Sequence, residues 1–260
     1  MDLKKCTILI IGGTSGIGLE LVRQLQLQGA KLIVTGRKED GLRQVKKMFS
    51  EVYTFQSDVS KTEDIEELFF KVTKQFPSLN MIINNAGVMR LLDVQDYWLR
   101  MEDITKEIDS NLKGTIHMVH KFLSHLLSKE SSAIVNVSSA ISYIPYSLAP
   151  VYSASKAGVH AYTQALRLQL ENSSVKVFEV VPPGVNTNLQ NNWLIQPDQS
   201  QMMDVDKMVS EVLIGLNKGK LEIRPGLSGV IKLASRIAPN FLLKFGHREF
   251  EKFQALHKIN

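Results

Sequence analysis

The 260-residue chain is predicted to fold as a single α/β domain, a doubly wound parallel sheet flanked by helices. Short apolar runs alternate along the chain with longer segments whose apolar residues recur at helical spacing, a pattern typical of parallel sheets. A glycine-rich turn joins the first apolar run to the first helical segment. No linker, internal repeat or low-complexity segment divides the sequence, so we expect one domain over residues 1–260.

The first turn carries the residues expected of a dinucleotide-binding loop. Ile8–Ile11 is predicted as a buried strand, and Gly12-Gly13-Thr14-Ser15-Gly16-Ile17-Gly18 leads from it into an amphipathic helix. In such a Rossmann-type arrangement Gly12 permits the tight turn, Gly16 lets the backbone approach a pyrophosphate, and Gly18 lets helix and strand pack closely. The helix N-terminus offers free N–H groups to the phosphates. The predicted cofactor contacts are Gly12, Thr14, Ser15, Gly16, Ile17 and Gly18.

The end of the second predicted strand, Leu32–Thr35, indicates which dinucleotide is bound. NAD-specific sites usually place an acidic residue there to bind the ribose hydroxyls. This chain has Gly36 and then Arg37, whose guanidinium can hold the 2′-phosphate of NADP through charge-assisted hydrogen bonds. The alternative is a solvated Arg37 beside Lys38. NADP(H) is therefore the preferred cofactor, and NAD(H) stays open.

Two further strands are expected to end beside the cofactor. Val52–Phe55 precedes Asp58, which can accept a hydrogen bond from the adenine amino group or cap the next helix. Met81–Ile83 ends in Asn84-Asn85-Ala86-Gly87, whose small and amide residues suit a backbone lying against a cofactor, although an ordinary turn uses the same residues. The contacts predicted here are Asp58, Val59, Asn85, Ala86 and Gly87.

The segment Tyr152-Ser153-Ala154-Ser155-Lys156 holds a proton donor and a cation. In a helix, Tyr152 and Lys156 lie four residues apart on one face. A phenol has a pKa near ~10, and a nearby ammonium lowers that pKa toward neutral pH, so the pair can move a proton. Tyr-x-x-x-Lys also occurs by chance on surface helices. The significance of the pair therefore depends on the motifs around it.

The order of the motifs is what indicates a family. Gly-x-x-x-Gly-x-Gly, Asn-Asn-Ala-Gly, Asn111 in a long helix, Val137-Ser138-Ser139, Tyr152-x-x-x-Lys156 and Pro183-Gly184 follow one another. The chain thereby resembles the classical short-chain dehydrogenase/reductase family along nearly its whole length. Ile11 and Asn80 stand where that family usually has Thr and Asp. It is most similar to a subgroup named after the D-alanyl–teichoic-acid operon oxidoreductases, a name that records gene neighbourhood and no substrate.

The resemblance implies a role for each matching residue. Tyr152 would be the general acid in carbonyl reduction and the base in alcohol oxidation, and Lys156 would lower its pKa and hold the nicotinamide ribose. Ser139 would donate a hydrogen bond to the substrate oxygen; Ser138 is the rival, but the thirteen-residue spacing to Tyr152 favours Ser139. Asn111 would break its helix locally and hold a water that links Lys156 to solvent. The further cofactor contacts are Tyr152, Lys156, Pro183, Gly184, Val185 and Thr187.

The implied reaction is NADP(H)-dependent hydride transfer that interconverts a carbonyl compound and a secondary alcohol. A hypothesis of another class is a catalytically silent protein that binds or senses NADP(H). Such a sensor needs the glycines and Arg37 but has no need of a tuned phenol, which favours the enzyme. Epimerase or dehydratase chemistry on the same fold would also use Tyr152 and Lys156. The sequence names no substrate, although an NADP preference favours reduction.

The second half is expected to cover the site. Residues 185–205 are rich in Asn, Gln, Ser and Pro and follow the strand predicted at Val175–Val181, so they predict a substrate lid or a disordered connector. Trp193, Leu194 and Ile195 would give a lid an apolar lining. An edge strand is predicted at Leu221–Arg224. In the tail, about residues 227–260, basic residues alternate with Ile237, Phe241, Leu242, Phe245, Phe250 and Phe253, interrupted by Pro239 and Gly246.

Charge and composition limit the classes of partner that are expected for this chain. Residues 216–260 carry a net charge of +6 and the rest of the chain −1, so no basic face for nucleic acid is expected. The basic tail predicts either peripheral contact with an anionic membrane or packing on a neighbouring subunit or the substrate site. A single cysteine, Cys6, excludes an intrachain disulfide and suits a reducing, cytoplasmic compartment.

One long helix is expected to serve two surfaces. Its apolar stripe comprises Ile104, Ile108, Leu112, Ile116, Val119, Leu123 and Leu126. In the family that the chain resembles, this helix and the Tyr152 helix also pair with a second subunit, which implies a homodimer or homotetramer. His117, His120 and His125 lie near the stripe without a further ligand set, so they predict surface or interface histidines and no metal site.

Overall fold

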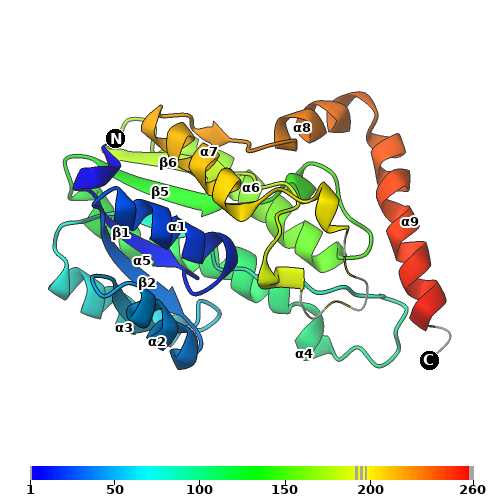
Figure 1. Cartoon of the computed structure of the whole chain (residues 1–260), viewed down its shortest axis with the longest axis horizontal. Helices are drawn as coiled ribbons and strands as arrows, with labels where there is room; N and C mark the ends of the chain where they lie inside the picture. The colour runs from blue at the N-terminus through cyan, green and yellow to red at the C-terminus, as the bar shows by residue number, and fades with distance from the viewer. Residues whose placement is uncertain (1, 191–192, 194–195, 197, 258–260) are drawn as a thin grey trace.

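The computed structural model describes residues 2–190, 193, 196 and 198–257, and they form an α/β fold (Figure 1). Within these residues a seven-stranded sheet has the order β3-β2-β1-β4-β5-β6-β7, and every adjacent pair is parallel. The strands are β1 (Thr7–Ile11), β2 (Lys31–Gly36), β3 (Tyr53–Gln56), β4 (Leu79–Asn84), β5 (Ser132–Val137), β6 (Val175–Val180) and β7 (Glu222–Ile223). The strand order reverses between β1 and β4, and ligands bind at such a point in doubly wound sheets.

Helices cover both faces of the sheet, which buries every residue of β1. Ile8 and Ile10 pack in a core with α1 (Gly16–Leu27), α2 (Glu39–Met48) and α7 (Val205–Asn217). Leu9 and Ile11 face the opposite core, because successive strand residues point to opposite faces. That second core contains α3 (Thr62–Gln75), α5 (Gly114–Leu127) and α6 (Pro150–Gln169). The predicted doubly wound fold is confirmed.

The predicted strands differ from the observed ones by at most two residues at each end, and β7 is an edge strand as expected. The long helix predicted over residues 104–126 is divided in the structure. A short helix, α4 (Met101–Ile104), is followed by a wide π-helical turn over Ile108–Lys113, and α5 continues from it. Short 3₁₀ helices occur at Leu3–Lys5, Ala140–Ser142, Asn188–Gln190 and Gln199–Gln201.

Two helices, α8 (Ser228–Ile237) and α9 (Pro239–His257), follow the last strand, and α9 stands at the far end of the molecule in Figure 1. Pro239 separates them as predicted, but Gly246 does not interrupt α9. A Cβ at Gly246 would lie 3.6 Å from the Tyr146 ring, so the glycine lies where α9 packs on that ring. None of the described helices is long and apolar enough to cross a membrane.

Candidate active site

A cavity of about 1490 Å³ opens where the strands end. Its lining includes the glycine turn after β1, the ends of β2, β4, β5 and β6, and parts of the C-terminal helices. Every predicted site residue lines this cavity except Gly18, Asp58 and Asn111. The fold therefore brings together segments that are spread over more than two hundred positions of the sequence.

Three glycines of the turn occupy positions where a Cβ would be strained or would clash. Gly12 and Gly16 have φ angles of +77° and +51°, which residues with a Cβ adopt rarely. Gly18 does not line the cavity, and a Cβ there would lie 2.1 Å from the carbonyl oxygen of Gly12. Its role is thus close packing, while Asn85 Nδ2 donates to the same oxygen at 2.9 Å and holds the turn against β4.

The end of β2 presents cations and unpaired hydroxyls to the cavity. Arg37 and Lys38 are exposed, line the cavity and form no ion pair with any described residue. Thr35 Oγ1 and Ser57 Oγ also belong to lining residues, and both are buried without a hydrogen-bond partner in the described chain. Buried hydroxyls normally have a partner. These orphaned atoms and the cationic rim fit the ribose and phosphate of a dinucleotide.

Asp58 makes local contacts, and its hydrogen bond with the adenine amino group stays a prediction. Its Oδ1 accepts hydrogen bonds from the Ser60 backbone N–H at 3.0 Å and from Ser60 Oγ at 2.8 Å. The carboxylate thus closes the turn before α3, and its neighbours Ser57 and Val59 line the cavity instead. The sequence prediction missed Ser57, although its place at the end of β3, one residue before Asp58, was an available signal.

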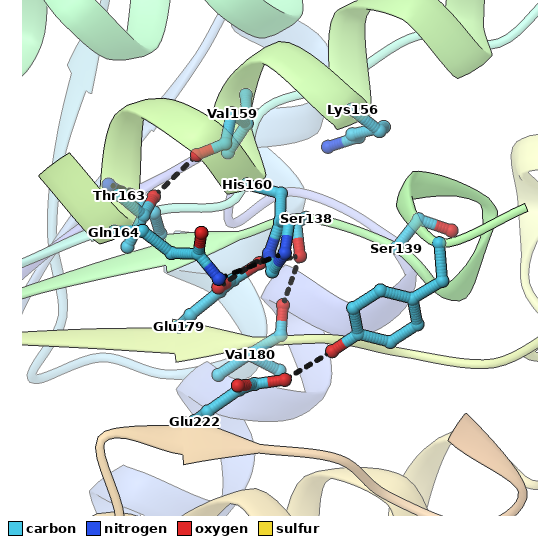
Figure 2. A network of polar contacts seen from close by, with 12 residues as sticks. Ser138, Ser139, Lys156, Val159, His160, Thr163, Gln164, Glu179, Val180 and Glu222 are labelled. Atoms are coloured by element: carbon cyan, nitrogen blue, oxygen red, sulfur yellow. Dashed lines mark hydrogen bonds and ion pairs between the residues drawn. The ribbon is translucent and has the colours of Figure 1, made fainter. Parts of the chain in front are cut away.

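The two serines after β5 face different partners. Ser138 Oγ donates to Glu179 Oε1 at 2.5 Å, deep in the sheet, and Glu179 also contacts His160 Nδ1 at 2.8 Å. Figure 2 shows Ser138 turned into this group and Ser139 set apart from it. The Ser139 side chain interacts with Tyr152 and lowers its pKa. The geometry therefore favours Ser139 over Ser138 as the serine that faces a ligand.

Tyr152 and Lys156 lie on α6 and are 7% and 4% exposed. Burial raises the pKa of Tyr152 to about 12, and the Ser139 side chain offsets only part of that effect. The predicted lowering of this pKa is thus not found. Lys156 Nζ lies 5.7 Å from the ring centroid and donates to the Val137 carbonyl at 2.8 Å. Burial lowers the pKa of Lys156 to about 8, which weakens the cation that would favour a phenolate.

Asn111 lies in the wide π-helical turn that precedes α5. The predicted local break of the helix is therefore present. Asn111 Oδ1 accepts from the Val88 backbone N–H at 2.8 Å, and its Nδ2 donates to the Val88 carbonyl and to Ser155 Oγ, each at 2.9 Å. A Cβ at Gly87 would lie 3.4 Å from Asn111 Oδ1 and 3.5 Å from Lys156 Nζ. The amide therefore ties the β4 loop to α6 beside the lysine.

The segment after β6 closes one side of the cavity. Pro183, Gly184, Val185 and Thr187 all line it, and Thr187 lies 3.3 Å from the position of a Cβ at Gly16. The two ends of the predicted lid are joined, because Met203 N donates to the Gly184 carbonyl at 2.9 Å. Trp193 lines the cavity as predicted and donates from Nε1 to the Met89 carbonyl at 3.4 Å. Leu194 and Ile195 lie outside the described residues.

The chain is similar in sequence to short-chain dehydrogenases and oxidoreductases, and similar in fold to short-chain dehydrogenases. A family profile described as short chain dehydrogenase matches residues 6–198. The uncharacterized oxidoreductase DltE of Bacillus subtilis is 35% identical over 224 residues, which cover 86% of this chain and 89% of the relative. Among solved structures, a short chain dehydrogenase from Burkholderia cenocepacia in complex with NADP has a TM-score of 0.80 at 24% identity, covering 96% of this chain and 98% of the other. One from Burkholderia phymatum in complex with NAD has a TM-score of 0.80 at 20% identity, covering 91% and 95%.

Proposed function

Because this chain belongs to the short-chain dehydrogenase family, we propose that it is an NADP(H)-dependent oxidoreductase that interconverts a carbonyl compound and a secondary alcohol. The observation that carries the proposal is one cavity that holds Ser139, Tyr152 and Lys156 together with the glycine turn. The cofactor, when bound, supplies or takes up the hydride. The protein supplies position, a proton and hydrogen-bond donors.

Tyr152 is the proton donor in this proposal. Burial keeps its phenol protonated at neutral pH, since burial raises its pKa to about 12, and the Ser139 side chain interacts with it. As negative charge grows on a substrate oxygen, Ser139 donates a hydrogen bond to it and Tyr152 transfers its proton to it. An ammonium on Lys156 then stabilises the phenolate. A phenol that holds its proton this firmly suits reduction better than oxidation, which needs the phenolate first.

Arg37 and Lys38 support NADP(H) as the preferred cofactor. They follow Gly36, which stands at the end of β2 where NAD-specific sites carry an acid, and they form no ion pair with any described residue. Structural relatives occur with NADP and with NAD, so the choice rests on this chain's own residues. We expect NADPH to bind more tightly than NADH, and Arg37→Ala to weaken NADPH binding while leaving NADH binding unchanged. Fluorescence titration of each nucleotide measures both; tighter binding of NADH would contradict the assignment.

The reaction is tested with a panel of carbonyl compounds, by following the loss of NADPH absorbance with NADH run in parallel. Tyr152→Phe removes the transferable proton, and we expect turnover to fall by at least ~100-fold. Tyr162→Phe is the matched control, because Tyr162 lies on the same helix but packs in the core away from the cavity. Near-wild-type turnover in Tyr152→Phe would refute the assignment. NADPH binding without turnover of any carbonyl compound would favour the silent NADP(H)-binding protein.

A further inference from the structure

The C-terminal helices reach the reaction cavity. Ile231 of α8 and Phe253 of α9 line it, although the part of the chain that matches the short-chain dehydrogenase profile ends at residue 198. These two side chains therefore belong to a segment that the family profile does not describe. Phe253 is 3% exposed, so its ring is held in place against neighbouring residues.

Shared neighbours connect Phe253 with the reacting phenol. Tyr152 packs in a small apolar cluster with Met89, and Phe253 packs in a second cluster. Leu91 and Tyr146 pack against both clusters. One continuous apolar surface thus runs from the Tyr152 ring to α9.

Polar contacts fix α8 and α9 over the cavity. Lys232 of α8 forms an ion pair with Glu222 at 2.6 Å, and Glu222 also accepts a hydrogen bond from Tyr143, four residues after Ser139. On α9, Gln254 Nε2 donates to Asp93 Oδ2 at 2.9 Å, and His247 lies within hydrogen-bond distance of Ser147. Helix α8 is therefore anchored to β7, and α9 is anchored to the loops that carry Asp93 and Ser147.

The cavity lining includes charged side chains such as Lys106 and Asp109, but it also contains a set of apolar and aromatic ones. We define the apolar wall as Ile141, Ile144, Tyr146, Trp193, Ile231 and Phe253, all of which line the cavity. Burial raises the pKa of Tyr146 to about 12, so its phenol is neutral at neutral pH. The nearby cation Arg90 is paired with the fully buried carboxylate of Glu107 and donates to the Asp103 carbonyl as well. Among the described residues of this wall, nothing matches a charged substrate group.

We propose that the apolar wall selects carbonyl substrates that bear a bulky, uncharged apolar group, with Phe253 as the specificity-determining residue. The proposal rests on the proposed function, since it describes the substrate of that same site. An apolar group placed on this wall loses contact with water, whereas a carboxylate placed there would lose its hydration without gaining a partner.

Three ketones with NADPH test the proposal: 2-adamantanone as the bulky apolar case, cyclohexanone as the small one and 4-oxopentanoate as the charged one. We expect kcat/KM to be highest for 2-adamantanone and lowest for 4-oxopentanoate. Phe253→Ala should lower kcat/KM for 2-adamantanone by at least about 10-fold and change cyclohexanone by less than about twofold. The matched control is Phe245→Ala on the same helix, because Phe245 is 62% exposed and should change neither value.

A binding measurement that does not need turnover separates this inference from the reaction itself. The chain has two tryptophans, so in a Trp98→Phe background the fluorescence comes from Trp193 in the wall. We expect 2-adamantanone to change that fluorescence saturably, with a Kd that rises at least about 10-fold in Phe253→Ala. Equal effects of Phe253→Ala and Phe245→Ala, or preference for 4-oxopentanoate, would overturn the wall as selector while leaving the reductase intact. Saturable binding of 2-adamantanone without reduction of any ketone would instead refute the proposed function.

Discussion

The buried amino group of Lys156 should make the stability of the protein rise with pH. Burial lowers its pKa from the ordinary value of 10.5 to about 8. Between these two values the unfolded chain still binds a proton at this side chain and the folded chain does not. Stability therefore increases as pH rises through that window. At about 1.4 kcal/mol for each pKa unit, the gain from Lys156 is about 3 kcal/mol.

The assay is urea unfolding without added cofactor at half-unit steps from pH 7 to 10, for the wild type and for Lys156→Met. Other groups titrate as well: burial raises the pKa values of Cys6, Tyr146 and Tyr152, so these groups oppose the trend above about pH 9. They are present in both proteins and cancel in the difference. We expect the unfolding free energy of the wild type to rise relative to the variant by about 2.5 kcal/mol between pH 7 and pH 10, which is most of the full gain.

Lys176→Met is the matched control, because Lys176 is exposed on β6 and loses the same formal charge. Its unfolding free energy should follow the wild type at a constant offset. Parallel curves for the wild type and Lys156→Met would refute the reasoning, since they would mean that Lys156 has the same proton affinity in the folded and unfolded chain.

Four further predictions concern the glycine turn, the buried Glu179, the oligomeric state and the C-terminal tail. Gly18→Ala places a Cβ 2.1 Å from the Gly12 carbonyl oxygen, so we expect NADPH affinity, measured by titration, to fall at least about 10-fold. Unchanged affinity would refute the close packing of Gly18 against Gly12. Glu179→Ala removes the partner of Ser138, and we expect kcat to fall while NADPH affinity is retained. Glu179→Gln should restore most of kcat. Equal loss of kcat in both variants would exclude a positioning role for Glu179. We also propose a homodimer or homotetramer, which a monomer mass by light scattering at micromolar concentration would contradict. The C-terminal tail is tested by flotation with acidic liposomes, with and without residues 230–260. Equal flotation of the two proteins would exclude membrane contact through the tail.

Local sequence patterns were sufficient for the sheet and for the glycine turn. An apolar run of five residues such as Thr7–Ile11, followed by Gly12, Gly16 and Gly18, has few structural solutions, because only glycine tolerates those backbone angles and approaches. The Tyr152–Lys156 spacing likewise determines that both side chains share a helix face. These features depend on residues close together in the chain, which is why they could be predicted.

Only the tertiary structure decided which partner each side chain meets. Ser138 and Ser139 are adjacent in sequence and chemically alike, and the buried Glu179 on the neighbouring strand determines that Ser138 turns inward. The pKa of Tyr152 rises because burial in the folded chain outweighs the opposing effect of Ser139, a balance that the Tyr152–Lys156 spacing does not show. The packing of Tyr146 against the cluster that contains Phe253 joins residues about one hundred positions apart. Burial and long-range packing are properties of the folded chain, so the apolar end of the cavity was visible only there.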